Sequence, residues 1–291
     1  MNIPDFPFAR TDYPLGPCTW YHVGGPARVA LLPRTRQEMQ DAYAWMLTQD
    51  APRLILGGGS NMLISDAGFP GIALISTEFR QIEALGDDRY SLTSGNSLDE
   101  MVQQIMVANN YAGVGALTGI PGTIGGAMFM NAGTANGSTC ALLESAEVLT
   151  PSGLSVIPVT PGSHSYRRQS FCAPGEVILG GVFRFEKSNE DQRAVFDHYM
   201  QRRRERQPKG YCCGSVFKNP EGGHAGQLIE ACGLKGMRHG GAVISDMHAN
   251  FIMNDADASF DDIMELIALA KDRVREQFGV TLQEEVRIIQ G

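Results

Sequence analysis

The stretch from Gly113 to Gly133 is the part of the chain whose residue types best suit ligand binding. It reads GVGALTGIPGTIGGAMFMNAG, in which seven of 21 residues are glycine and none is acidic or basic. Glycine lets a backbone approach a ligand closely or turn at positive φ, and the N–H groups of such turns suit an anion. A flexible linker would be polar, whereas this stretch is apolar. It indicates backbone laid against a large, partly apolar, partly anionic ligand. A glycine-rich buried turn without a ligand is the alternative.

Two shorter glycine clusters strengthen the first interpretation. They are Val23-Gly24-Gly25-Pro26 and Leu56-Gly57-Gly58-Gly59-Ser60-Asn61. Neither belongs to a common nucleotide loop: in the G-x-G-x-x-G pattern that begins at Gly57, Met62 occupies the third glycine position, and no G-x-x-x-x-G-K-[ST] occurs. The sequence therefore predicts a dinucleotide site that is neither a Rossmann site nor a P-loop.

Composition bounds the class of protein. The net charge is 24 − 32 = −8, with 43% apolar and 19% charged residues, as in a globular protein with a large core. An acidic chain argues against a nucleic-acid surface and an anionic membrane partner. No apolar run is long enough to span a membrane, and the first ten residues do not resemble a signal peptide. We expect a cytoplasmic enzyme that acts on small molecules, with no obligate protein partner.

The cysteines and histidines suggest neither disulfides nor a metal. The six cysteines form no C-x-x-C pair, and the six histidines lack metal-ligand spacing. We expect reduced thiols and no metal. Cys212-Cys213 precedes Ser215 by two residues and is either a pair of small packing residues or an oxidation-sensitive site. His22, beside Gly24, is interpreted as a hydrogen-bonding or packing residue.

Strands and helices alternate along most of the chain. Strands are predicted at 29–32, 54–56, 62–64, 72–76, 147–150, 155–159, 177–179, 182–185 and 285–289. Capping boxes at Thr35-x-x-Glu38, Ser97-x-x-Glu100 and Ser259-x-x-Asp262 begin three helices. The predicted inner face of the first helix consists of Met39, Ala42, Tyr43 and Met46, and that of the last consists of Ile263, Ile267, Ala270, Val274 and Phe278. Further helices are predicted at 189–207, rich in arginine, and at 225–232. Composition shifts after Glu186, so we expect one domain at 1–186, with two subdomains split near residue 57 as an alternative, and a second domain at 187–291.

The glycine clusters belong to an ordered set of motifs that resembles one family. The set continues with Gly119-Ile120-Pro121-Gly122-Thr123-Ile124-Gly125-Gly126-Ala127, Met130-Asn131-Ala132-Gly133, Tyr166-Arg167, Gly214-Ser215-Val216-Phe217-Lys218-Asn219-Pro220, Gly233-Leu234-Lys235-Gly236, His248-Ala249-Asn250-Phe251-Ile252 and Leu282…Glu285-Val286-Arg287. In this order the set is similar to that of the UDP-N-acetylenolpyruvoylglucosamine reductases (MurB, also called UDP-N-acetylmuramate dehydrogenases). It covers nearly the whole chain.

The resemblance implies an α+β flavoprotein. The first domain would be an FAD-binding domain of the vanillyl-alcohol-oxidase (PCMH) type, and the second the α+β substrate domain of the reductase. The implied reaction is the NADPH-dependent, FAD-mediated reduction of UDP-N-acetylglucosamine enolpyruvate to UDP-N-acetylmuramate in peptidoglycan precursor synthesis. FAD would be held non-covalently, with NADPH as co-substrate.

The resemblance also assigns roles to individual residues. Three match the family's catalytic residues: Arg167, Ser215 and Glu285. Those implied to bind FAD are Gly24, Gly25, Gly57, Gly59, Ser60, Asn61, Gly119, Ile120, Pro121, Gly122, Thr123, Gly125, Gly126, Ala127 and Asn131. Those implied to bind substrate are Tyr166, Lys218 and Asn219.

The implied reaction has a clear electrostatic difficulty. Hydride addition to an unsaturated carboxylate builds an enolate dianion, so the site must supply positive charge and hydrogen-bond donors and a proton for the adjacent carbon. The planar fork of Arg167 suits the carboxylate, Ser215 matches the proton donor, and Glu285 would be protonated or act through water. By residue type alone, the three residues are better explained as a surface arginine, a turn hydroxyl and a strand-edge acid, and the ordered family motifs favour the catalytic interpretation.

Some positions depart from the family pattern. Gln169 stands where the family usually has serine, and Ala116 where it usually has glutamate. The 48 residues between Arg167 and Ser215 (215 − 167) place the chain in the shorter class, which lacks an extra tyrosine-bearing loop. The alternatives are a flavin oxidase or dehydrogenase acting on a hydroxy acid or polyol, and a flavin-binding protein that has lost catalysis.

Overall fold

The computed structural model describes residue 3 and residues 5–290, and packing divides the chain into two compact units. Unit 1 comprises the described residues up to Thr11, Val29–Gly58 and Gly71–Arg203. Unit 2 comprises Asp12–Arg28, Gly59–Pro70 and the described residues from Arg204 onward. These units are defined by packing, whereas the boundary expected at residue 186 concerns ligand binding and stays a prediction.

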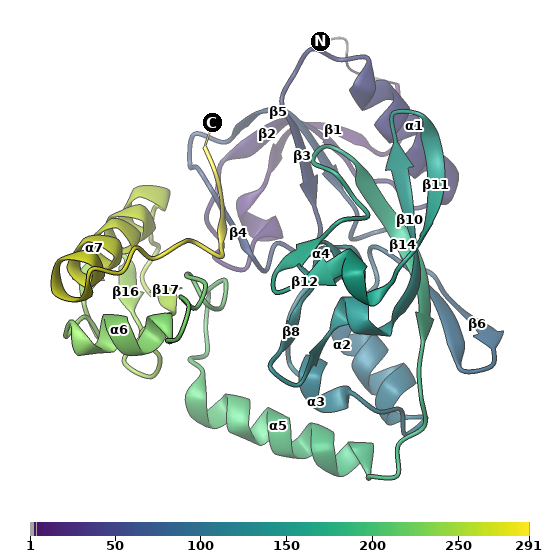
Figure 1. The fold of residues 1–291 in the computed structure, drawn as a ribbon. Helices are drawn as coiled ribbons and strands as arrows, with labels where there is room; N and C mark the ends of the chain where they lie inside the picture. Colours follow the sequence, from purple (N-terminus) through teal and green to yellow (C-terminus); the bar gives the residue numbers. More distant parts are fainter. Residues whose placement is uncertain (1–2, 4, 291) are drawn as a thin grey trace. The chain divides into compact units, whose positions relative to one another are not determined.

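Unit 1 contains a five-stranded antiparallel sheet with the order β11-β10-β14-β7-β6 (Figure 1). Its strands are β6 (Ile82–Gly86), β7 (Arg89–Thr93), β10 (Leu143–Thr150), β11 (Gly153–Pro158) and β14 (Val177–Arg184). The predicted hairpin β10–β11 is confirmed, with Thr150 paired to Gly153. The two strands predicted at 177–179 and 182–185 are one strand. Gly180-Gly181, expected to separate them, lies inside β14, where a Cβ on Gly180 would be 2.2 Å from the Leu92 carbonyl oxygen.

A second sheet has the order β1-β2-β5-β3. Its strands are β1 (Ala9–Pro14), β2 (Pro26–Leu31), β3 (Arg53–Leu56) and β5 (Phe69–Ile75), and β3 pairs parallel with β5. Helix α1 (Arg36–Leu47) begins at the predicted capping box, where Thr35 accepts from the Glu38 amide. The predicted inner face of α1 is buried and forms a core with these strands: Met39, Ala42, Tyr43 and Met46.

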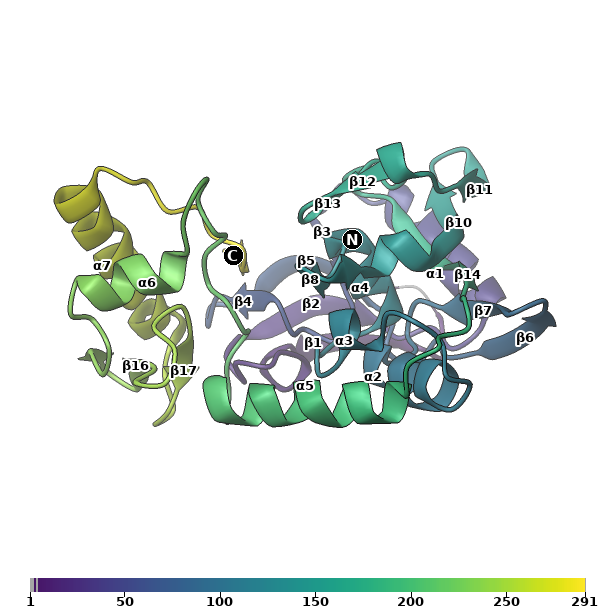
Figure 2. The same ribbon diagram turned by 60° about the horizontal axis from the view of Figure 1, so that its bottom comes forward.

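The remaining elements of unit 1 are mostly short. Ser97 begins α2 (Leu98–Glu100) through the predicted capping box, and a π-helical segment, Met101–Val107, continues it. The others are α3 (Val114–Leu117), α4 (Ile124–Met130), β8 (Gly133–Thr134), β9 (Gly137–Ser138), the 3₁₀ turns Thr139–Leu142 and Pro161–Ser163, β12 (His164–Ser165) and β13 (Arg168–Gln169). The arginine-rich helix is α5 (Gln192–Arg206), which lies alongside α3 (Figures 1 and 2). A Cβ on Gly115 of α3 would be 2.5 Å from the Tyr199 ring of α5.

Unit 2 packs around one core of its own. Its elements are the 3₁₀ turn Gly16–Cys18, β4 (Met62–Ile64), α6 (Ala225–Ala231), β15 (Arg238–His239), β16 (Ala242–Ile244), β17 (Ile252–Asn254), α7 (Phe260–Phe278) and β18 (Arg287–Ile289). Four predicted inner-face residues of α7 are buried in the core: Ile263, Ile267, Ala270 and Val274. Phe278, also assigned to that face, is 40% exposed, because it is the last residue before the cap Gly279 and the helix end leaves the core.

Candidate functional site

The segment Gly113–Gly133 folds as two short helices joined by a tight turn. Thr123 is the N-cap of α4, and its hydroxyl accepts from the Gly126 amide at 3.5 Å. Asn131 ends α4 in the left-handed conformation, with φ = 43°. Its side chain donates to the Ser165 carbonyl at 2.8 Å and accepts from the Cys140 amide at 3.1 Å. Asn131 is therefore a link between α4 and its surroundings, and its predicted role toward FAD stays a prediction.

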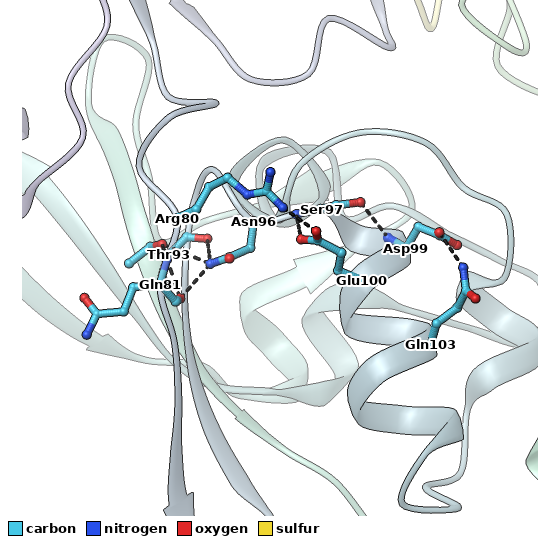
Figure 3. A network of polar contacts seen from close by, with 8 residues as sticks. All are labelled: Arg80, Gln81, Thr93, Asn96, Ser97, Asp99, Glu100 and Gln103. Carbon is cyan, nitrogen blue, oxygen red and sulfur yellow. Dashed lines mark hydrogen bonds and ion pairs between the residues drawn. The ribbon is translucent and has the colours of Figure 1, made fainter. Parts of the chain in front are cut away.

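A polar network at the end of β7 holds the turn between β7 and α2, against which the start of α4 packs (Figure 3). The side-chain amide of Asn96 donates to the Gln81 carbonyl at 2.6 Å and to the Thr93 carbonyl and hydroxyl, both at 3.0 Å. Arg80 forms an ion pair with Glu100. The backbone of the same turn accepts from the glycine segment: Ile124 N binds Asn96 O at 2.8 Å, and Gly125 N binds Ser94 O at 2.9 Å. The network therefore fixes the start of α4.

Two of the predicted glycine clusters lie side by side in unit 1. A Cβ on Gly57 would be 2.5 Å from the Thr123 hydroxyl, and one on Gly58 would be 3.1 Å from the Gly122 α-carbon. Side chains at Gly57 and Gly58 would therefore collide with the turn. The sequence could not place these segments together, because about 60 residues separate them.

The chemistry around these glycines fits FAD, which carries an anionic diphosphate. The segment has no acidic side chain that would repel an anion. The stem of Arg203 lies against it, since a Cβ on Gly119 would be 2.7 Å from Arg203 Cδ, and burial lowers the pKa of this guanidinium. Ser94, next to Gly125, has a buried hydroxyl that finds no partner among the described residues. An uncompensated buried hydroxyl is costly, and a polar ligand atom would satisfy it.

Three glycines of unit 2 that were predicted to bind FAD, Gly24, Gly25 and Gly59, are also required by packing. A Cβ on Gly59 would be 1.9 Å from the Cys18 carbonyl oxygen, and one on Gly25 would be 2.2 Å from the Asp66 carbonyl oxygen. A Cβ on Gly24 would be 2.9 Å from the Ile64 Cβ. These contacts account for glycine at all three positions, so their role toward FAD stays a prediction.

Ser215 and Glu285 lie on adjacent backbone segments of unit 2. The Glu285 amide donates to the Val216 carbonyl at 2.7 Å, and the Lys218 amide donates to the Gln283 carbonyl at 2.9 Å. Between these bonds, Phe217 and Glu284 form an antiparallel bridge. The structure thus brings together two of the three predicted catalytic positions, which are 70 residues apart (285 − 215).

The terminal strand explains how Glu285 reaches this place. β18 pairs parallel with β4, with Arg287 opposite Met62. Immediately before the pairing begins, the side-chain amide of Asn61 donates to the backbone carbonyl of Glu285 at 3.0 Å. The backbone amide of Arg287 donates to the backbone carbonyl of Asn61, also at 3.0 Å. Asn61, predicted to bind FAD, therefore also holds Glu285.

Arg167 lies at the tip of the β12–β13 hairpin in unit 1. Its backbone is left-handed (φ = 54°), a conformation uncommon outside glycine, asparagine and aspartate. The guanidinium donates to the Gly133 carbonyl at 3.3 Å and lies 5.0 Å from the centre of the Tyr166 ring. Tyr166 is 57% exposed. Backbone strain of this kind clusters at functional sites, and the roles of Arg167 and Tyr166 toward substrate stay predictions.

The structure explains the departure at Gln169. Its side-chain amide accepts from the Cys172 amide and donates to the Cys172 carbonyl, both at 2.7 Å. These bonds brace the turn that follows β13, so the longer side chain preserves an ordered loop behind Arg167. Ala116 is buried in α3, where a Cβ on Gly137 would be 3.3 Å from it.

The two substrate candidates of unit 2 differ in exposure. Lys218 is half-buried and its amide belongs to the bridge to Gln283, whereas Asn219 is exposed. The Asn219 side chain accepts from the Ala225 amide at 3.1 Å and so stabilises the start of α6, whose N-cap residue His224 makes no side-chain cap.

Comparison with known proteins identifies the family. Residues 207–289 match the family model described as the C-terminal domain of UDP-N-acetylenolpyruvoylglucosamine reductase, and residues 27–157 match an FAD binding domain. The chain is 37% identical over 297 residues to the UDP-N-acetylenolpyruvoylglucosamine reductase of Chloroflexus aggregans, covering 96% of this chain and 97% of the relative. The chain belongs to the UDP-N-acetylenolpyruvoylglucosamine reductase family. The resemblance read from the ordered motifs is thereby confirmed.

Other members of the UDP-N-acetylenolpyruvoylglucosamine reductase family agree in sequence and structure. The Clostridium beijerinckii enzyme is 35% identical over 272 residues, covering 92% of this chain and 89% of the relative. The crystal structure of UDP-N-acetylenolpyruvylglucosamine reductase (MurB) from Thermus caldophilus matches with a TM-score of 0.80 at 31% identity, covering 99% of both chains. The predicted fold class, an α+β FAD-binding domain joined to the reductase's C-terminal domain, is confirmed.

Among residue 3 and residues 5–290, no group of three or more His, Cys, Asp or Glu side chains could hold a metal ion. Within the same residues, no helix is long and apolar enough to cross a membrane. The sequence assigned no role to Asn250, which stands in the motif His248-Ala249-Asn250-Phe251-Ile252 and whose side chain bonds to the backbone of Phe217.

Proposed function

We propose that this protein catalyses the NADPH-dependent, FAD-mediated reduction of UDP-N-acetylglucosamine enolpyruvate to UDP-N-acetylmuramate in peptidoglycan precursor synthesis. Family membership supports the reaction, since the relatives are named reductases of this substrate. The observation that carries the proposal is the bond between the Glu285 amide and the Val216 carbonyl, because it places Glu285 beside the segment of Ser215.

FAD is proposed to be held without a covalent bond by the glycine-rich backbone of the turn around Gly57, Gly122 and Gly126, with Gly24, Gly25 and Gly59–Asn61 also contributing. When bound and reduced by NADPH, it supplies the hydride that the reaction requires. The half-buried Arg203 suits the charge of its diphosphate. The residues that we propose for FAD binding are those predicted from the sequence, with 1–186 as the FAD-binding region and 187–291 as the substrate region.

The remaining chemistry is assigned to side chains of this chain. Arg167 binds the substrate carboxylate through its planar fork and stabilises the negative charge that develops there. Ser215 holds the proton that is transferred to the adjacent carbon. Glu285 acts on the developing enolate in its protonated form or through water. Tyr166, Lys218 and Asn219 are proposed to contact the UDP-sugar.

The proposed setting follows from the reaction. The proposed substrates are small molecules, and we propose a cytoplasmic enzyme without a nucleic-acid, membrane or obligate protein partner. The net charge of −8 favours this proposal over a nucleic-acid surface.

A spectroscopic titration of the purified protein tests the function. Acid precipitation should leave yellow FAD in the supernatant, because the cofactor is held non-covalently. Anaerobic NADPH should bleach the flavin, and UDP-N-acetylglucosamine enolpyruvate should restore its colour with formation of UDP-N-acetylmuramate. Bleaching by a hydroxy acid or polyol, with no recovery on the enolpyruvyl sugar, would favour the oxidase alternative. Protein that is bleached by NADPH, regains no colour on the enolpyruvyl sugar and is not bleached by a hydroxy acid or polyol would indicate that catalysis has been lost.

A further inference from the structure

We propose that Asn250 is a positioning residue that fixes the backbone at Ser215 and, through it, Glu285. Asn250 is buried in unit 2, and its side chain pairs with the backbone of Phe217. Its role is therefore to hold two proposed catalytic groups rather than to react. The inference rests on the proposed function.

Three hydrogen bonds tie Asn250 to the residues that follow Ser215. The Val216 amide donates to the Asn250 carbonyl at 2.8 Å. The Phe217 amide donates to Asn250 Oδ1 at 3.0 Å, and Asn250 Nδ2 donates to the Phe217 carbonyl at 2.9 Å. A primary amide offers a donor and an acceptor in one plane, so its side chain pairs with both backbone groups of Phe217 as a neighbouring strand would.

The same segment carries Glu285. The Val216 carbonyl accepts from the Glu285 amide at 2.7 Å and from the Val286 amide at 3.2 Å. The N–H of Val216 thus bonds to Asn250, and the C=O of Val216 bonds to Glu285. A shift of the Val216 peptide would move Ser215 and Glu285 together, which is why one buried amide affects both.

Asn250 is itself fixed by its own turn. The backbone amide of Asn250 donates to His248 Nδ1 at 3.2 Å. In the same turn, the Ser245 hydroxyl accepts from the backbone amides of Met247 and His248 at 3.2 and 3.3 Å. Asn250 is 3% exposed, so water does not replace a lost bond. Only asparagine supplies this pairing: aspartate keeps the acceptor for the Phe217 amide but loses the donor to its carbonyl.

Asn254 provides a matched control in the next strand. Its side chain also pairs with backbone on both sides, donating to the Tyr21 carbonyl at 2.8 Å and accepting from the Ala258 amide at 2.8 Å. Neither partner is adjacent to Ser215 or Glu285 in the chain. Asn254→Asp therefore removes a comparable donor in the same unit without touching the segment that carries the two proposed catalytic groups.

The experiment compares Asn250→Asp and Asn254→Asp in the FAD-loaded full chain by stopped flow and by amide hydrogen exchange. For Asn250→Asp, we expect recovery of flavin colour on the enolpyruvyl sugar to slow by roughly 10–100-fold, the effect of small misplacement. Its flavin spectrum and its reduction by NADPH should match the unsubstituted protein. The Phe217 and Glu285 amides should exchange faster. Asn254→Asp should change none of these, even if its Tm falls.

Other results overturn the inference. If flavin colour recovers on the enolpyruvyl sugar at the normal rate in Asn250→Asp, Asn250 is an ordinary core residue. The same conclusion follows if both half-reactions slow equally in Asn250→Asp and Asn254→Asp. If Asn250→Asp does not fold, Asn250→Ser, which keeps a short donor and acceptor, takes its place under the same criteria. If the unsubstituted protein itself does not turn over the enolpyruvyl sugar, the proposed function fails. The exchange of the Phe217 and Glu285 amides then decides the positioning role by itself.

Discussion

The side-chain amide of Asn61 donates a hydrogen bond to the backbone carbonyl of Glu285 at 3.0 Å, although 224 residues separate them. The reciprocal backbone bond from the Arg287 amide to the Asn61 carbonyl, also 3.0 Å, completes the contact. Gly59-Ser60-Asn61 is among the segments predicted to bind FAD. The loop that carries these residues therefore also holds the backbone of the catalytic candidate Glu285. The segment Glu285–Arg287 is thereby joined to the loop that carries Asn61.

Asn61→Asp tests this relationship. The substitution removes the donor and leaves the half-buried Glu285 carbonyl without its partner, which should cost about 1–3 kcal/mol of unfolding free energy. Urea denaturation measures that loss. We also expect slower recovery of flavin colour on the enolpyruvyl sugar at saturating FAD. If the loss appears only as weaker FAD binding, with normal turnover once the protein is loaded, then Asn61 serves the cofactor alone.

Gly59→Ala tests whether packing dictates the glycine in that loop. The new Cβ would be 1.9 Å from the Cys18 carbonyl oxygen and 2.8 Å from the Thr19 α-carbon, at φ = 62°. We expect a loss of roughly 2–5 kcal/mol, from overpacking together with left-handed strain. Gly279→Ala is the control, since Gly279 has φ = 68° and nothing within 4 Å. It should lose only about 1–2 kcal/mol. Equal losses in urea denaturation would show that φ alone matters.

Local sequence signals predicted most of the elements. The capping boxes at Thr35, Ser97 and Ser259 each begin a helix, because a cap is a contact over three residues that spacing reveals. The break predicted at Gly180-Gly181 was wrong for the opposite reason. Glycine there permits the close approach of a neighbouring strand, which depends on pairing between distant segments rather than on the local chain.

The candidate site shows the same limit. Residue types and the family resemblance named Ser215 and Glu285, but only the fold shows that Val216 joins them. The sequence gives Asn250 no role, because the role proposed for it depends on two hydrogen bonds to Phe217, 33 residues away. A buried amide that pairs with distant backbone leaves no periodicity or spacing in a sequence.

Lys271→Met tests the ion pair beside the site, in which Lys271 Nζ lies 2.6 Å from Glu284 Oε1. Partial burial raises the pKa of Glu284, but the bond and charge of Lys271, with a backbone hydrogen bond, outweigh it and hold the pKa below 4.5. The pair therefore adds stability above that pH, and the contribution is lost as pH falls through the lowered pKa. We expect about 0.2–1 kcal/mol at pH 7, because both side chains are partly solvated. A loss that persists at low pH would indicate packing of the lysine stem instead.

Arg167→Lys separates charge from geometry at the hairpin tip. Lysine keeps the positive charge but loses the planar fork that suits a carboxylate. The barrier for reduction of the enolpyruvyl sugar should rise by about 2–4 kcal/mol, as for loss of one oxyanion donor. Reduction of the flavin by NADPH should be much less affected, and single-turnover kinetics distinguish the two. Equal slowing of both would assign Arg167 to the flavin or to the fold.

Ser215→Ala tests the proposed proton donor. The NADPH half-reaction should remain near normal, because reduction of the flavin does not need this hydroxyl. The enolpyruvyl half-reaction should slow by at least ~10²-fold, the lower end of what a positioned acid contributes. Ser215→Cys should retain part of the activity, since a thiol is similar in size and can also donate a proton. Stopped-flow absorbance of the flavin measures each half-reaction separately.

The surroundings of Ser215 make this test a sharp one. Gly214 has φ = 73° and nothing within 4 Å of its Cβ position, and the segment after Ser215 is held by backbone bonds to Asn250 and Glu285. Removal of the hydroxyl should therefore leave the backbone in place, and Tm should change little. An unimpaired enolpyruvyl half-reaction in Ser215→Ala would leave water or Glu285 as the acid. Slowing of both halves with weakened FAD binding would instead make Ser215 a structural turn residue, because a proton donor to substrate has no part in binding the flavin.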